Sequence, residues 1–250
     1  MLVRARYRVP AVQLAVIAGA LVLFALSSGF YPFLPPLPSL FKAAIAVLAK
    51  KVAYGHFAVT LYESLLGFGI AVVLGVIVGG AIGASRTATE LFNPIILALY
   101  SIPKIIFLPL MMMIFGVGLA PKIANAALHA FFPIVLNSLV AMREVDRIHL
   151  KVARSMSASQ IQLARKVYLP GMVLPVFAGI RLGLGLAFMG ALLAELFESK
   201  AGVGYYVIQF YTSGRIAEMI VIILAVFALI LLINAGMQHI ENRLSVWRRA

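Results

Sequence analysis

The sequence predicts an all-α membrane protein with six transmembrane helices, and three observations support that fold class. Of the 250 residues, 63% are apolar and 12% are charged, and the mean hydropathy is +1.05; ordinary globular domains are about half apolar and about 25% charged. Six segments reach the roughly 20 apolar residues that cross a hydrocarbon core. The polar stretches between them are too short to bury a core of their own. We therefore expect one membrane domain over 1–250, with its core at 58–240.

The expected spans follow one another with short connections. The first begins after MLVRARYR and superficially resembles a signal peptide, but the later apolar runs favour a retained span. The third is the least regular, because Pro94, Pro103 and Pro109 each remove a backbone donor. Such a broken helix either walls a pathway or is a kinked packing helix. The six expected spans cover 9–29, 58–84, 91–115, 121–142, 172–196 and 216–238.

A proline-rich turn and an amphipathic helix are expected between the first two spans, within PFLPPLPSLFKAAIAVLAKKVAYGHF. Leu40, Ala44, Val47 and Leu48 recur there at helical spacing. We interpret this helix as one that lies on the outer membrane surface.

The distribution of Lys and Arg predicts the orientation, since these residues concentrate in cytoplasmic loops. Thirteen fall on one side and six on the other, which places both termini and the 143–170 loop in the cytoplasm. The formal charge of +13 is therefore of the juxtamembrane kind and does not indicate nucleic acid. The side with six carries Lys42, Lys50, Lys51, Lys122, Lys200 and Arg215, and Lys104 and Arg181 fall inside spans.

Composition and spacing argue against an enzyme. The chain has no cysteine, which excludes disulfides and thiolate chemistry. Its four histidines are scattered, so no metal site is expected, and its eight acidic residues are dispersed. No P-loop or nucleophile motif is present.

Small residues recur every four positions in two spans, at Gly75, Gly79 and Gly83 and again at Gly179, Gly183, Ala187 and Ala191. Such stripes let helix backbones approach closely in lipid. They predict a compact bundle and favour a dimer.

Three charged residues inside spans are candidates for a translocation path. Lys104 and Arg181 would supply positive potential for an anion, and Glu195 lies near the outer end of the fifth span. Each is equally consistent with a structural ion pair or a side chain that reaches the interface. Phe107 and Met111 would suit an aromatic or alkyl group.

The loop SMSASQIQLARKVYLP, residues 155–170, is polar, basic and compatible with helix. Its pattern predicts one short helix over 149–158 and a second over 159–168 that Pro170 ends. A protrusion of this size is suited to insertion into a groove on another subunit.

Residues 150–196, which begin LKVARSMSASQIQLARKVYLPG, closely resemble the EAA loop and the following span of binding-protein-dependent ABC importer permeases. The resemblance continues through IPKIIFLPLMMMIFGVGLAPKIANAALHAFFPIVLNSLVAMREVD (102–146) and GVGYYVIQF (202–210), and covers roughly 35–245. The nitrate, sulfonate and taurine permease group is the most similar.

The resemblance implies a type I ABC importer permease fold in a bacterial inner membrane, with a coupling-helix loop that docks on a cytoplasmic ATPase. It implies two ATPase subunits that use ATP and Mg, a second permease copy, an extracytoplasmic binding protein, and no cofactor on this chain. By position, the family's glutamate falls at Lys151, its alanines at Val152 and Ala153, and its glycine at Ser157. The coupling residues implied are Leu150, Lys151, Val152, Ala153, Arg154, Ser157, Ala158, Leu169 and Pro170.

The substrate stays open at this point. A small anion is the first expectation, and an aromatic or vitamin-precursor metabolite is the alternative. An ATP-independent channel or secondary transporter is a further alternative, although the two halves show no convincing inverted repeat.

Overall fold

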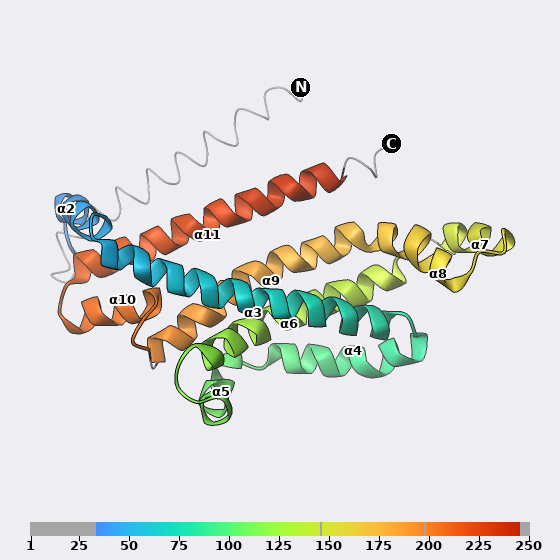
Figure 1. The fold of residues 1–250 in the computed structure, drawn as a ribbon, viewed down its shortest axis with the longest axis horizontal. Coiled ribbons are helices and arrows are strands. Elements are labelled where there is room, and N and C mark those ends of the chain that lie inside the picture. The colour runs from blue at the N-terminus through green and yellow to red at the C-terminus, as the bar shows by residue number, and fades with distance from the viewer. Residues whose placement is uncertain (1–33, 146, 198, 246–250) are drawn as a thin grey trace, which may run out of the picture. The chain divides into compact units, whose positions relative to one another are not determined.

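The computed structural model describes residues 34–145, 147–197 and 199–245, and the regular elements in those ranges are all helices (Figure 1). The first expected span, 9–29, lies outside the described residues. The chain divides into two compact units, Met1–Tyr54 with Val207–Ala225 and Gly55–Tyr206 with Val226–Ala250. The single domain expected over 1–250 stays a prediction.

Four of the described helices are long and apolar enough to cross a membrane, and a bent pair of helices makes a fifth candidate span. The four correspond to the expected second, fourth, fifth and sixth spans. The helices of the second and fifth begin earlier than expected, at Lys51 and Gln160, that of the sixth runs on to Leu244, and that of the fourth, Leu119–Arg143, is nearly as expected. The described elements are α2 (Leu37–Leu48), α3 (Lys51–Gly83), α4 (Arg86–Ser101), the 3-10 helix η1 (Lys104–Phe107), α5 (Leu108–Phe115), α6 (Leu119–Arg143), α7 (Arg147–Ser155), α8 (Gln160–Leu163), the π-helix η2 (Ala164–Tyr168), α9 (Leu169–Phe197), α10 (Val203–Thr212) and α11 (Ile216–Ser245).

The segment expected as the third span is sharply bent, which confirms the irregularity that its prolines predicted. Helix α4 and the η1–α5 segment meet at an angle of 84°. The break falls at Ile102 and Pro103, which have extended backbones with ψ of 131° and 107°. A residue before proline is pushed out of the helical region, so Pro103 explains the break. Pro94 lies inside α4, and Pro109 lies in the first turn of α5, where a missing N–H costs nothing.

Helices α3, α6 and α9 form the core of the second unit through their small residues. A side chain at Gly79 would run into the Val135 carbonyl of α6, and a Cβ at Gly183 would lie 2.8 Å from Ile134 Cδ1. Ala187 and Ala191 are fully buried in the same cluster as Ile134. Both stripes therefore pack on α6 within one chain, which confirms the compact bundle and leaves the dimer a prediction.

In the first unit, α2 begins after Pro36 and buries Ala43 and Val47. The expected helix is confirmed; Leu40 and Ala44 of its apolar face are partly buried and Leu48 is 40% exposed. Its place on the outer membrane surface stays a prediction. Further along this unit, Arg215 binds Glu218 at 2.8 Å.

The expectation that Pro170 ends a short helix is wrong, because α8, η2 and α9 run on as one helix from Gln160 to Phe197. The π-helix supplies the physical reason. In it the Leu169 N–H donates to the Ala164 carbonyl, five residues back. A proline in an α-helix lacks its N–H and clashes with the carbonyl four residues earlier, and a widened turn just before Pro170 relieves that clash.

Candidate functional site

Helix α7 ends in a tight turn centred on Ser157, which has a φ of 55° and is the only non-glycine residue with positive φ in the described chain. The Ser157 N–H donates to the Arg154 carbonyl at 3.0 Å, and the Ala158 N–H donates to the Ala153 carbonyl at 3.1 Å. These two bonds define a Schellman motif, whose left-handed position is usually glycine. Ser157 thus occupies this left-handed position although it is not glycine.

Helix α8 begins two residues later with a capping box. The Gln162 N–H donates to Ser159 Oγ at 3.3 Å, and the Ser159 N–H donates to Gln162 Oε1 at 2.8 Å. Ser-x-x-Gln is a recognised signal of this box, and sequence reasoning missed it although the signal is present. The turn between α7 and α8 is therefore fixed from both sides by local hydrogen bonds.

The two faces of α7 differ in burial. Leu150 packs with Val145 and Met172 in a small core cluster. Lys151 and Arg154 are exposed, and so are the apolar side chains of Val152, at 52%, and Met156, at 77%. At the other end of the loop, Leu169 and Pro170 are exposed. An amphipathic helix in a single chain that leaves apolar side chains exposed has a face available to another molecule.

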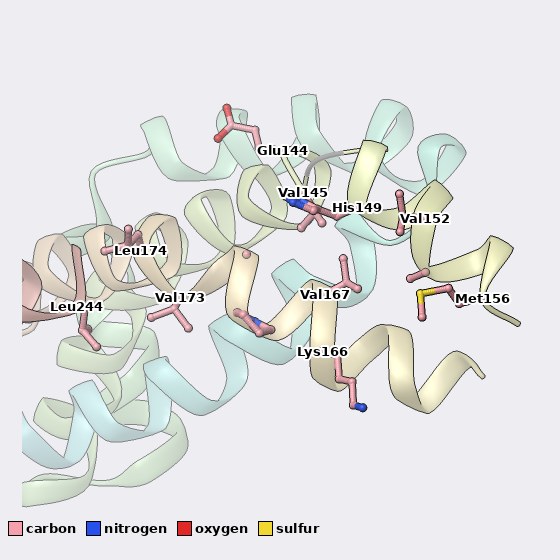
Figure 2. A pocket seen from close by; sticks show the side chains of 13 residues that line it. Glu144, Val145, His149, Val152, Met156, Lys166, Val167, Val173, Leu174 and Leu244 are labelled. Carbon is pink, nitrogen blue, oxygen red and sulfur yellow. The ribbon is translucent and has the colours of Figure 1, made fainter. Parts of the chain in front are cut away.

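A groove of about 850 Å³ lies between α7 and the start of α9. Figure 2 shows Val152 of α7 and Met156, which directly follows α7, on one side and Val167 of η2 on the other. Its lining is largely apolar, with Lys166, His149 and Glu144 as polar members. The groove and the exposed face of α7 together form what we call the loop surface.

The break in the third span carries Lys104, the first residue of η1. Its Nζ donates to the Tyr100 carbonyl at 2.8 Å and lies 4.5 Å from the centroid of the Tyr100 ring and 5.3 Å from that of Phe132. Both rings are within cation–π range. Among the ion pairs formed by described residues, none includes Lys104.

The other candidate path residues lie in different surroundings. Phe107 ends η1 and is half-buried, and Met111 lines an apolar groove of about 600 Å³ between α3, α5 and α6. Arg181 of α9 donates to Glu241 of α11 at 2.8 Å, with about a third of each side chain exposed. Within the described chain, Lys104, Arg181 and Glu195 form no ion pair with one another.

Glu195 anchors the turn that leads into α10. Its Oε1 accepts from the Thr60 hydroxyl and its Oε2 from the Gly204 N–H, each at 2.6 Å. Thr60 Oγ1 also accepts from the Val203 N–H at 2.8 Å, and the Gly202 N–H donates to His56 Nδ1 at 3.1 Å. The first N–H groups of α10, which a helix cannot satisfy internally, are thus bound by side chains of α3 and α9.

A buried ion pair lies beside this turn. Lys122 Nζ binds Glu63 Oε1 at 2.8 Å, with 6% and 0% of the two side chains exposed, and it also reaches the Ala201 carbonyl at 3.4 Å. The expectation that Lys122 is a loop charge is wrong, because α6 begins at Leu119 and buries it. Sequence reasoning missed the cluster because its members are 59 or more positions apart and have no shared motif.

The described residues contain no group of three or more His, Asp or Glu side chains able to hold a metal ion. What they do contain is a set of long apolar helices, a broken span with a cation at the break, and a rigid helical loop. The long apolar helices indicate a multi-pass membrane protein.

Comparison with known proteins identifies the family. The chain belongs to the binding-protein-dependent transport system inner membrane components, which match residues 71–246. It is 30% identical over 223 residues to the taurine transport system permease protein TauC of Escherichia coli (strain K12), with 86% of this chain and 80% of the relative covered. It is 33% identical over 205 residues to the riboflavin transport system permease protein RibX of Chloroflexus aurantiacus, with 80% and 76% covered.

The fold has a solved counterpart. A chain of the MetNI methionine ABC transporter in an inward-facing conformation superposes with a TM-score of 0.64 at 23% identity, which covers 74% of this chain and 93% of that one. The protein is therefore an ABC importer permease with an ABC permease fold, and the resemblance of the 150–196 region is confirmed at the level of the family.

Proposed function

We propose that this chain is the transmembrane subunit of an ATP-driven importer that receives a small solute from an extracytoplasmic binding protein. It works with a second permease copy and two ATPase subunits, which hydrolyse ATP with Mg. It lies in a bacterial inner membrane with six spans and both termini in the cytoplasm, and the 143–170 loop contacts the ATPase. ATP hydrolysis takes place on the separate subunit.

The single observation that carries this proposal is the construction of the 143–170 loop. Family membership gives the class, and the loop adds a rigid element of the shape that such a subunit requires. The Schellman turn and the capping box hold α7 at a fixed angle to α8, and α8 continues without a stop into α9. A push on α7 is transmitted along one continuous helix into the span.

Reconstitution with the ATPase subunit encoded beside this chain, and with its binding protein, tests the proposal. We expect substrate-stimulated ATP hydrolysis and ATP-dependent uptake into vesicles. Ala153→Glu places a carboxylate in the apolar groove of the loop surface, where it loses solvation, and is expected to abolish stimulation without preventing insertion. Ala49→Glu, at an exposed position just after α2, is the matched control. Uptake without ATP would instead support a channel or secondary transporter.

A small anion is the substrate class that we infer. Lys104 supports it, because no described carboxylate pairs with this partly buried cation, and such a cation attracts an anion strongly in a low-dielectric path. Arg181 supports it less, since Glu241 already balances its charge. The alternative, an aromatic or vitamin-precursor metabolite, draws on the apolar setting of Phe107 and Met111 and on the likeness to RibX.

The test has two readouts. Thermal unfolding of the binding protein is measured with nitrate, bicarbonate, taurine and other sulfonates, and with riboflavin-like aromatic compounds. A stabilising shift with an anion supports the inference, and a shift with aromatic compounds alone contradicts it. Lys104→Met is then expected to lower uptake more than assembly, whereas Lys104→Arg keeps most of the uptake. Equal loss of uptake and assembly in Lys104→Met would mean that the lysine is structural.

A further inference from the structure

The loop surface has an unusual charge. From Arg147 to Pro170 the chain has five Lys or Arg residues and one histidine, and it has no Asp or Glu. Lys151, Arg154, Arg165 and Lys166 are exposed in the structure. None of these four forms an ion pair with a described carboxylate. The field of this surface is therefore mainly positive, with Glu144 at one end of the groove as an acidic member.

The same surface offers apolar anchors. Val152 on α7 and Met156, one residue past its end, are joined by a hydrogen bond from the Met156 N–H to the Val152 carbonyl. They expose 52% and 77% of their area and open onto the groove beside η2 (Figure 2). Residues four apart on a helix share a face. Exposed apolar side chains with a charged rim are the usual composition of a protein interface.

A protein partner in the aqueous phase fits this surface better than a membrane does. The continuous helix from Gln160 to Phe197 has 38 residues, and at about 1.5 Å per residue it is about 57 Å long. The hydrocarbon core is only about 30 Å thick. Part of this helix therefore extends beyond the hydrocarbon core, and residues 160–168, which include Gln160, Gln162, Arg165 and Lys166, are its most polar stretch. Helix α7 packs beside the start of this helix through Leu150, which contacts the cluster around Met172.

We propose that the loop surface docks on a partner whose groove is acidic at its rim and apolar at its floor. Carboxylates of the partner face Lys151 and Arg154, and an apolar pocket takes Met156. This inference rests on the proposed function, because the partner is the ATPase subunit. The inference adds that the ATPase groove is negatively charged where this chain is positive. Complementary charge of this kind makes the chain select its own ATPase, since it governs partner choice and association rate.

The decisive variant is Lys151→Glu, which places the family's usual glutamate at its motif position. Binding of the neighbouring ATPase subunit is measured with the chain in nanodiscs of phosphatidylcholine alone, at low and at high salt. We expect the affinity of the unaltered chain to fall about tenfold or more between 50 and 500 mM salt, because salt screens exposed charges. Lys151→Glu is expected to weaken binding at low salt by a further fivefold or more, on the order of what reversal of one interfacial charge does.

Lys42→Glu is the matched control, since it reverses an equally exposed lysine on α2 and is expected to leave ATPase binding unchanged. Met156→Ala tests the apolar anchor and is expected to weaken binding at both salt concentrations alike. Neither change lies in the buried core, so folding is expected to survive in each variant.

The outcomes separate this inference from the proposed function. If the unaltered chain binds no ATPase at any salt concentration, the proposed function fails, and the inference fails with it. If it binds the ATPase but Lys151→Glu binds equally well or more tightly, the inference alone is overturned. A parallel measurement gives the affinity of the chain in these nanodiscs for vesicles with anionic lipid. If Lys151→Glu changes that affinity and leaves ATPase binding unchanged, the surface binds a membrane and the inference is again overturned.

Discussion

Replacement of Ser157 by glycine is expected to stabilise the turn that orients α7. Ser157 has a φ of 55°, and a non-glycine residue in the left-handed region costs about 1–2 kcal/mol. Glycine removes that cost but loses about 0.5–1 kcal/mol more backbone entropy on ordering. The expected net gain is about 0.5–1 kcal/mol for the closed turn.

Hydrogen exchange of the Ala158 amide measures this gain directly, because that N–H donates across the turn to Ala153. Exchange from a locally opened turn slows in proportion to the opening equilibrium. A gain of 0.5–1 kcal/mol corresponds to about two- to fivefold slower exchange, at 1.36 kcal/mol per factor of ten. The experiment uses the full chain in nanodiscs, with amides of α6 as internal references.

Ser157→Ala separates the backbone effect from loss of the hydroxyl. Alanine keeps the left-handed strain, so its Ala158 amide is expected to exchange at least as fast as in the serine protein. If glycine and alanine slow exchange equally, the strain argument is wrong and the hydroxyl is what destabilises the turn. If glycine gives no change, the turn is held by contacts outside the Schellman bonds.

Three further substitutions address the core and the outer turn, each measured by thermal unfolding in detergent. Lys122→Met leaves Glu63 charged and unpaired in a buried site, which is expected to cost about 3–5 kcal/mol, whereas Lys122→Met with Glu63→Met recovers most of it; no recovery would contradict the pairing. Gly79→Ala drives a Cβ into the backbone of α6 and is expected to cost about 1–3 kcal/mol, while Gly80→Ala, which meets nothing within 4 Å, is nearly neutral; equal effects would contradict the packing. Glu195→Ala strips the acceptors from two buried donors, at about 1–3 kcal/mol each, and a stability unchanged from that of the unaltered chain would show that water replaces them.

The parts of the fold that the sequence predicted are those set by composition and by local spacing. Apolar length located the expected second to sixth spans to within a few residues at most ends. The glycine stripe at 75, 79 and 83 predicted close helix packing, but only the structure shows that its partner is α6. The three prolines predicted that the third span would be irregular. They did not predict the position of the bend, because the sequence does not show which proline interrupts the helix. In the structure the residue before Pro103, Ile102, has an extended backbone, whereas Pro94 lies inside α4.

What sequence reasoning missed depends on two kinds of information. The course of the chain through Pro170 depends on a π-helix, which no propensity scale encodes, because it is a compensation for one local clash. The cluster around Glu195 and Lys122 depends on three helices that meet in space. Each acid looked isolated in the sequence, and only the packing of α3, α6 and α9 brings Glu63 to Lys122 and Thr60 to Glu195.

The turn between α7 and α8 and the turn before α10 are stabilised by different kinds of contact. We therefore expect mutations in the two turns to have different effects. The turn at Ser157 and Ser159 is closed by hydrogen bonds between residues no more than five positions apart, so a change on the exposed face of α7 leaves the turn intact. The turn before α10 is closed by side chains from α3, α6 and α9, so loss of one of these disturbs helix packing. Charge reversal at Lys151 is therefore expected to weaken ATPase binding with little change in thermal stability. Charge removal at Lys122 is expected to lower thermal stability. The reasoning would be contradicted if the Lys151 variant lost stability and the Lys122 variant kept it.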